Sequence, residues 1–179
     1  MAPPRRTDPV RALALALALV AAGWAGWSGW RWYTAAHDEP AAYAAERDRA
    51  LAAGEQAILN LNTLDHRNLT RGLDTWEDSA TGELRRQLTD GRAEFERQIQ
   101  RARTVSSARL LAGAVTELDT RAGRASVMVS LRVTVTAPKS EPVRKESRML
   151  GELTRTGDGW KLSGLGQPPV GAAGPADRP

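Results

Sequence analysis

The sequence is poor in the residue types that carry most protein chemistry: among 179 residues it has no cysteine, two histidines, two tyrosines and one phenylalanine. Without cysteine, the chain forms no disulfide and has no thiolate for catalysis or metal binding. His37 and His66 are isolated from each other and do not predict a metal cluster. The HExxH, GxSxG, P-loop and GxGxxG signatures are also absent from the sequence. We therefore expect no enzyme, no metal and no cofactor.

Lysine is scarce as well, and basic and acidic residues nearly balance outside the N-terminal region. Residues 1–31 contain four arginines and one aspartate, a net charge of +3. The remainder contains 21 basic and 20 acidic residues, a net charge of +1. A nucleic-acid-binding domain gathers lysine and arginine into a stripe or patch. The nearly neutral remainder, with both signs interspersed, therefore predicts no nucleic acid as a partner.

What the sequence does have is one long uncharged segment near its N-terminus. Ala12 to Trp30 contains no charged side chain and a single hydroxyl, that of Ser28. Wound as a helix, this segment would be about 28 Å long, close to the hydrocarbon thickness of a bilayer, and apolar on every side. The sequence therefore predicts a transmembrane helix over residues 12–33, preceded by a cytoplasmic N-terminus over residues 1–11.

The flanking residues predict how this helix lies in the plasma membrane. Arg5, Arg6 and Arg11 precede it, and a basic flank stays on the cytoplasmic side, so the C-terminal domain is expected to be extracytoplasmic. Tryptophan favours the headgroup level, so the tryptophans at the far end of the segment mark the outer interface. The residues predicted to form the membrane anchor are Leu13, Leu15, Leu17, Leu19, Trp24, Trp27 and Trp30.

Two features of this segment have alternative interpretations. A cleaved signal peptide would have the same basic start, with Thr34-Ala35-Ala36 as its cleavage site. The bulky tryptophans stand where a signal peptide normally turns small and polar, which favours an uncleaved anchor. Small residues let a second helix approach closely, although glycine is also common in membrane helices generally. The candidate helix-packing face consists of Gly23, Gly26 and Gly29.

After Pro40 the sequence predicts two long helices, over residues 41–64 and 81–103. No proline or glycine pair separates the first from the membrane segment, so we expect these two segments to be nearly continuous. The second helix has an apolar row with a glycine in it, formed by Leu84, Leu88, Gly91, Phe95 and Ile99. Each helix thus has one face suited to packing against a core.

Between the two long helices the sequence predicts a short helix over residues 65–69. Asp65 is expected to cap its N-terminus, and Gly72 is expected to end it. Trp76 is expected to lie buried against a sheet, and Trp160 to anchor the core. We interpret Asp65, Trp76 and Trp160 as structural residues.

The C-terminal half changes to the two-residue period of β-strands. The predicted strands cover residues 104–117, 127–135, 144–156 and 160–165, joined by short turns. Because helices precede an antiparallel meander, we predict an α+β domain over residues 34–165, with helices packed on one face of a curved four-stranded sheet. A curved sheet with helices on its concave side forms a cone, and this cone would have an apolar hollow. The proline- and glycine-rich tail over residues 166–179 is expected to be disordered.

Four stretches together resemble the Mce-associated membrane proteins of actinobacteria. They are "GWSGWRWY", "NLNTLDHRNLTRGLDTWEDSATGELRRQL", "VTELD…GRASVMVSLRVTVT" and "LTRTGDGWKLSGL". The resemblance covers roughly Arg11 to Leu165 and implies a nuclear-transport-factor-2-like fold. Asp65, Trp76 and Trp160 match recurring positions of the family. The resemblance also implies a function: an accessory or stabilising subunit of an Mce transporter, which imports lipids or sterols. It implies no catalytic residues.

Three functions follow as hypotheses. The first is a single-pass accessory subunit of an Mce-type lipid or sterol import complex, with the plasma membrane and Mce or permease subunits as partners. The second is a lipid- or sterol-binding carrier that uses the apolar cone, motivated by the apolar face from Val127 to Val135. The third, an enzyme of the same fold, is disfavoured because such enzymes place histidine, aspartate or tyrosine inside the cone, and Tyr33 and Tyr43 both lie near the membrane segment.

Overall fold

The computed structural model describes residues 9–168, with side chains described for residues 17–33 and 40–168. The chain divides into two compact units, Met1–Ala44 and Ala45–Pro179. We refer to the second unit as the head. The predicted cytoplasmic start and the predicted disordered tail fall largely outside the described residues.

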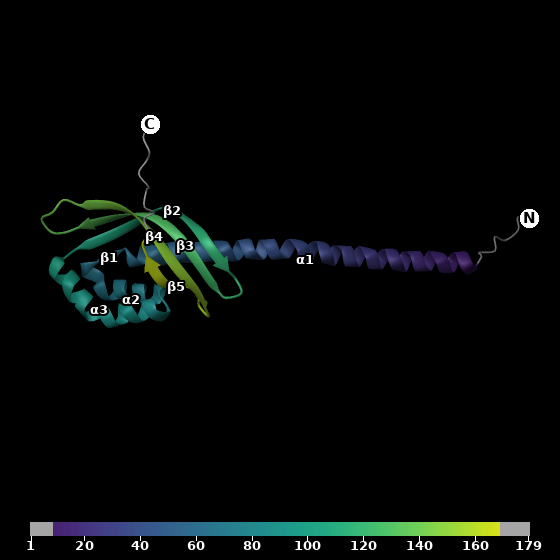
Figure 1. The fold of residues 1–179 in the computed structure, drawn as a ribbon, viewed down its shortest axis with the longest axis horizontal. Helices are drawn as coiled ribbons and strands as arrows, with labels where there is room; N and C mark the ends of the chain where they lie inside the picture. The colour runs from purple at the N-terminus through teal and green to yellow at the C-terminus, as the bar shows by residue number, and fades with distance from the viewer. Residues whose placement is uncertain (1–8, 169–179) are drawn as a thin grey trace, which may run out of the picture. The chain divides into compact units, whose positions relative to one another are not determined.

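The first unit contributes most of helix α1 (Pro9–Leu61), which runs without a break into the head (Figure 1). The expected near-continuity of the two N-terminal helical segments is thereby confirmed. In the predicted anchor, the side chains of Leu13 and Leu15 lie outside the described residues. The described ones, from Leu17 and Leu19 to Trp30, are exposed. No helix among the described residues combines the length and the apolar character that a membrane crossing requires.

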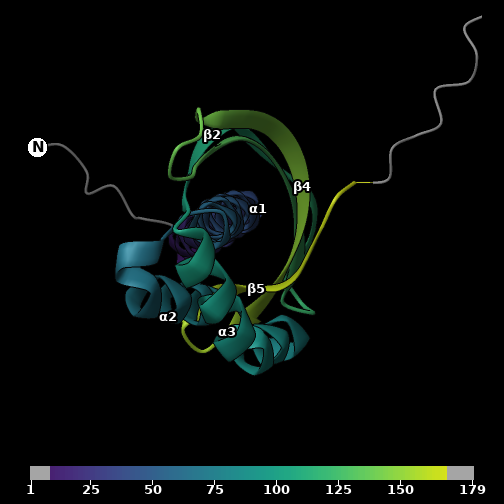
Figure 2. The same cartoon turned by 90° about the vertical axis from the view of Figure 1, so that its left-hand side faces the viewer.

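The head is an α+β domain built on one antiparallel sheet. Its strands follow chain order, β1-β2-β3-β4-β5. The last turns of α1 lie inside the curve of this sheet, and two further helices cross its open side (Figure 2). The elements after α1 are β1 (Leu64–Asp65), the 3-10 turn η1 (His66–Asn68), α2 (Leu69–Ser79), α3 (Gly82–Ala102), β2 (Val105–Asp119), β3 (Arg124–Thr136), β4 (Val143–Thr156) and β5 (Gly159–Gly166).

The prediction of four strands is wrong, because the sheet has five. The additional strand, β1, pairs Leu64 with Ser106 and Asp65 with Val105 at the start of β2. Two residues are too few to show the alternation by which a strand is predicted. The four longer strands occur where they were predicted, with ends that differ by a few residues.

The core forms where small residues let α1 approach the sheet. Ala50 and Ala57 are buried on α1. A Cβ added at Gly54 between them would lie 2.6 Å from Val127 Cγ2, which is closer than atoms pack. Ile58, on the same side, is fully buried. The interior is therefore filled by one helix whose backbone lies against the strands.

The packing of α1 also covers the apolar face of β3 that was predicted to line a hollow. Val127, Val129 and Leu131 of β3 are all 0% exposed. Gly151 of β4 pairs with Val127 in the sheet and lies against α1, since a Cβ there would lie 3.0 Å from Ile58 Cδ1. Close-packed side chains of this kind leave little room for a ligand.

Two predictions about the segment between the long helices are wrong. Gly72 does not end a helix: α2 runs through it to Ser79. Its role is close packing, because a Cβ at Gly72 would lie 2.4 Å from Leu64 Cδ1. Trp76 is half-buried rather than buried, and it packs beside Phe95 of α3 against a cluster that includes Leu64 of β1. Asp65 caps η1 by accepting a hydrogen bond from Arg67 N at 2.9 Å.

A polar joint fastens α1 to the sheet at the end of the head where the chain enters it. Glu46 Oε1 accepts hydrogen bonds from Trp160 Nε1 at 3.0 Å and from Arg155 Nη1 at 3.2 Å. Glu46 Oε2 pairs with Arg49 Nη1 at 3.0 Å. Arg155 also donates to Thr120 O at 3.0 Å, and its guanidinium stands 5.9 Å from the centre of the Trp160 ring. One carboxylate thus ties together three segments of the head.

Two helical glycines provide a matched test of the core packing. Replacing either by alanine improves helix propensity by about 1 kcal/mol. At Gly91 of α3 a Cβ meets nothing within 4 Å, so Gly91→Ala should raise the free energy of unfolding by that amount. At Gly54 the Cβ overlaps Val127, so Gly54→Ala should lower it by about 1–3 kcal/mol. Urea titration measures both changes, and a stabilised Gly54→Ala variant would contradict the close approach.

The polar joint predicts a pH-dependent stability. Burial alone would raise the pKa of Glu46, but hydrogen bonds from Arg49, Arg155 and Trp160 outweigh it and lower the pKa below its ordinary value of 4.5. Ionised Glu46 therefore stabilises the fold above pH 4.5, and this contribution disappears as the pH falls through the lowered pKa. Glu46→Gln should lower the free energy of unfolding at pH 7 by about 1–2 kcal/mol.

The difference in the free energy of unfolding between wild type and Glu46→Gln should disappear at acidic pH. Urea titrations at a series of pH values measure this difference. Asp48→Asn is the control on the same helix, because the Asp48 side chain is 69% exposed and pairs only with its neighbour Arg47 in the described residues. A pH-independent difference for Glu46→Gln, or an equal loss for Asp48→Asn, would show that the joint does not act as described.

Candidate functional site

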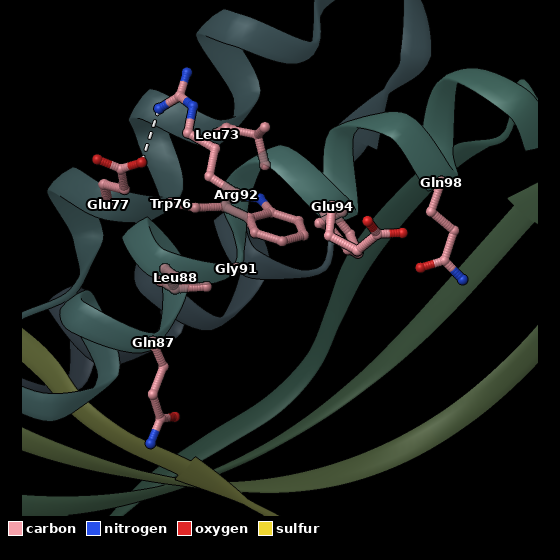
Figure 3. Close-up of a pocket in the computed structure, with 10 residues that line it drawn as sticks. Leu73, Trp76, Glu77, Gln87, Leu88, Gly91, Arg92, Glu94 and Gln98 are labelled. Carbon is pink, nitrogen blue, oxygen red and sulfur yellow. Dashed lines mark hydrogen bonds and ion pairs between the residues drawn. The ribbon is translucent and has the colours of Figure 1, made fainter.

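A groove with a volume of about 450 Å³ lies between α2 and α3 on the surface of the head (Figure 3). Its floor is apolar and its edges are polar. The floor consists of Leu73, Trp76, Leu88, Gly91 and Phe95. The edges carry Glu77, Gln87, Arg92, Glu94 and Gln98. This combination is typical of a binding surface, where an apolar centre is surrounded by a polar rim.

The groove arises from the apolar row of α3 that was predicted from sequence. That row includes Leu88 and Phe95, but no residue of α3 is fully buried. Gly91 lies between them and leaves open space where another residue would place a side chain. The row therefore has two roles. Leu84, Phe95 and Ile99 pack against the core clusters of the head. Leu88 and Phe95 also line a surface groove with a notch at Gly91.

The floor of the groove contains an aromatic pair. The rings of Trp76 and Phe95 have centroids 5.1 Å apart and are tilted by 43°. Trp76 Nε1 also donates a 3.4 Å hydrogen bond to Thr63 O, and Leu73 beside it is 4% exposed. This part of the floor is thus held in place from both helices and from Thr63, which follows α1. Tilted aromatic pairs of this kind add packing energy beyond the area that they bury.

The edge of the groove formed by Glu77 and Arg92 is fixed by a cluster of ion pairs, and we call this edge the ion-pair wall. Arg92 Nη1 lies 2.7 Å from Glu77 Oε1 and 2.8 Å from Asp74 Oδ1, which joins α3 to α2. Hydrogen bonds to Glu77 and then to Asp74 raise the pKa of the Arg92 guanidinium. Glu94, on the edge of the groove, pairs with Arg97 on its own helix. The charges on these edges are therefore largely compensated.

The geometry does not favour acid–base chemistry. His66 Nδ1 is buried without a hydrogen bond and lies 3.6 Å from Asp65 Oδ1. However, Asp65 is engaged by Arg67, whose hydrogen bonds lower the pKa of the carboxyl to about 2. A carboxylate with so low a pKa is a weak general base. Among the described residues, no group of three or more histidine, cysteine, aspartate or glutamate side chains could hold a metal.

The residues predicted to form the membrane anchor lie on α1, in the first unit. Trp24, Trp27 and Trp30 are 78%, 71% and 75% exposed. The candidate packing face is open, since a Cβ at Gly23, Gly26 or Gly29 would meet nothing within 4 Å. Trp160, interpreted as a structural residue, is 9% exposed in the core of the head. No pattern in the sequence groups Trp76 with the apolar row on α3, although Gly91 within that row was the available signal.

The ion-pair wall predicts a local change in stability. Arg92→Met removes the link from α3 to Glu77 and Asp74 while keeping an apolar side chain of similar length. We expect faster hydrogen exchange of the α2 amides, because the bridge between the helices is lost. Arg86→Met is the matched control, since Arg86 is 72% exposed and pairs with Glu83 on its own helix. Unchanged exchange in Arg92→Met would show that the wall does not depend on this bridge.

Comparison with known proteins gives a family and a fold. A family model described as "Uncharacterized protein Rv1363c/MT1408-like" matches residues 10–166. The uncharacterized protein Rv1363c of Mycobacterium tuberculosis is 28% identical over 120 residues, which are 66% of this chain and 45% of that protein. The chain therefore aligns with slightly less than half the length of this curated relative.

Two solved structures show the same fold at low sequence identity. An IcmL-like type IV secretion system protein from Legionella pneumophila superposes with a TM-score of 0.56 at 12% identity, over 69% of this chain and 93% of that one. The periplasmic domain of DotI superposes with a TM-score of 0.54 at 20% identity, over 67% of this chain and 93% of that one. The nuclear-transport-factor-2-like fold predicted from sequence agrees with these neighbours.

Proposed function

The chain belongs to the Rv1363c/MT1408-like protein family, and from this premise we propose that it is a non-enzymatic accessory subunit of a cell-envelope complex. In this proposal α1 tethers the chain to the plasma membrane and the head binds other subunits. The observation that supports it most directly is the preformed groove between α2 and α3, with its apolar floor and polar edges. One of the two solved neighbours, the IcmL-like protein from Legionella pneumophila, is a type IV secretion system protein, which supports a role within an assembly.

The groove has the features of a protein-docking site. Tryptophan and arginine are enriched among the residues that dominate binding energy at interfaces, and both occur here as Trp76 and Arg92. Because Trp76 is held by Phe95 and Arg92 by Glu77, neither side chain has to be ordered when a partner binds. Preorganisation of this kind lowers the entropic cost of association. The notch at Gly91 fits one apolar side chain of a partner.

The tether is proposed from the sequence of α1. The segment from Ala12 to Trp30 is uncharged, and basic residues precede it. Its hydrophobicity comes mainly from alanine and a few leucines, so stable insertion would depend on the tryptophans and on the flanking arginines. The head would then lie on the extracytoplasmic side of the plasma membrane.

The partner is proposed from the resemblance to Mce-associated membrane proteins. On that basis the complex is an Mce-type importer of lipids or sterols, and the groove binds one of its Mce or permease subunits. The carrier hypothesis has less support, because α1 fills the apolar face of β3 with Ile58 and the small residues around Gly54. A lipid ligand of the head would have to use the groove instead.

Filling the groove tests this proposal without unfolding the protein. Gly91→Leu places a side chain in the notch, where a Cβ meets nothing within 4 Å, and it improves helix propensity. We expect unchanged or higher thermal stability. We also expect the new side chain to cost at least about 1.4 kcal/mol of binding free energy, which corresponds to a roughly tenfold loss of affinity. Purification of the chain from native membranes should then recover about tenfold less of the Mce or permease subunits.

Ala93→Leu is the control, because it adds the same side chain to an exposed position of α3 that does not line the groove. This variant should retain the full yield. Full retention in Gly91→Leu would contradict the groove as the docking site. Absence of any Mce or permease subunit from the wild-type sample would contradict the proposed partner. A lipid bound to the wild type and lost only in Gly91→Leu would favour the carrier hypothesis.

A further inference from the structure

The outer face of the sheet carries a concentration of arginine that the sequence does not reveal. On β3 the residues from Ala125 to Leu131 alternate between buried and half-buried, and Arg132, next in the outward series, is exposed. Directly paired residues in an antiparallel sheet point to the same side. The partners of the outward residues of β3 therefore define the rest of this face.

The register places four arginines in three adjacent rows. Arg132 pairs with Arg109 of β2 and with Glu146 of β4. In the next rows, Thr134 pairs with Arg144 and Ser130 pairs with Arg148. We call the four arginines Arg109, Arg132, Arg144 and Arg148 the basic sheet face.

The basic sheet face is exposed and only partly neutralised. All four arginines are exposed, and Glu146, which pairs with Arg132 at 2.6 Å, is the one acidic residue in these rows. The local net charge is therefore +3, from four arginines and one glutamate. Within the described part of the chain, Arg109, Arg144 and Arg148 form no ion pair. Uncompensated guanidinium groups on a domain with nearly balanced charge attract an anionic partner.

The basic sheet face lies at the end of the strands away from the polar joint. The polar joint of Glu46 and Arg155 adjoins the start of β3, because Arg155 N donates to Gly123 O at 2.8 Å. Arg132 lies eight residues further along the strand than Arg124, or about 26 Å away. The arginines therefore lie at the end of the strands opposite the point where α1 enters the head.

We propose that the basic sheet face binds an acidic, extended segment of a protein partner. Guanidinium groups bind carboxylates through paired hydrogen bonds, which gives both strength and orientation. On an extended chain every second side chain points to the same side at intervals of about 6.6 Å, and outward residues along β3 and β4 have the same spacing. Alternate glutamates or aspartates can thus meet successive rows of arginines. This inference does not depend on the groove between α2 and α3.

A synthetic peptide tests the proposal on the full chain in neutral detergent. The probe is a fluorescein-labelled peptide of alternating glutamate and serine, and fluorescence anisotropy measures its dissociation constant. The double variant Arg144→Glu/Arg148→Glu changes two arginines that form no ion pair in the described residues, so the fold should persist. We expect the dissociation constant of this variant to be at least tenfold higher than that of the wild type. The double variant Arg144→Lys/Arg148→Lys, which keeps charge but loses the paired donors, should weaken binding to a smaller extent.

The matched control is Arg85→Glu/Arg101→Glu on α3, which changes net charge by the same amount at two exposed positions. It should bind the peptide as wild type does. Equal weakening in both glutamate variants would overturn the proposal, because net charge alone would then explain binding. Wild-type binding to phosphatidylglycerol vesicles without binding to the peptide would also overturn it in favour of a lipid surface. No binding to either probe would overturn it as well.

Discussion

The head depends on the close approach of α1 to the curved sheet. Gly54 leaves no room for even a methyl group against Val127, and Ala50 and Ala57 on either side are buried. The helix can therefore lie inside the curve of the strands, with Ile58 filling the interior. Because the same helix continues toward the N-terminus as the proposed tether, one element carries both the core of the head and its attachment.

This arrangement determines which surfaces remain for function. Because α1 packs against the concave face of the sheet, the side chains of Ile58, Val127 and Leu131 occupy the space that a carrier would need for its ligand. The surfaces that do remain lie on opposite layers of the head. One is the groove between α2 and α3, where Gly91 leaves a notch beside Trp76. The other is the basic sheet face, centred on Arg132. Both have the features of surfaces that contact macromolecules, as the proposed function requires.

Periodicity in the sequence predicted the long elements because their burial repeats along the chain. The alternation in β3 and the apolar row of α3 are examples, and both occur as predicted. Where a residue's role depends on distant parts of the chain, prediction failed. Gly72 packs against Leu64 and does not end a helix, and Trp76 is only half-buried, with its ring beside Phe95. The basic sheet face was invisible because its arginines come together only through strand register.

The central claim is that the chain holds a docking head at the membrane through α1. Washing native membranes with alkaline carbonate tests this most directly, because it releases peripheral proteins and retains those whose helices are inserted in the bilayer. The account predicts that the full chain stays in the membrane pellet, and that replacing Leu13, Leu15, Leu17 and Leu19 by serine releases it. Recovery of the wild-type chain in the wash would contradict the account.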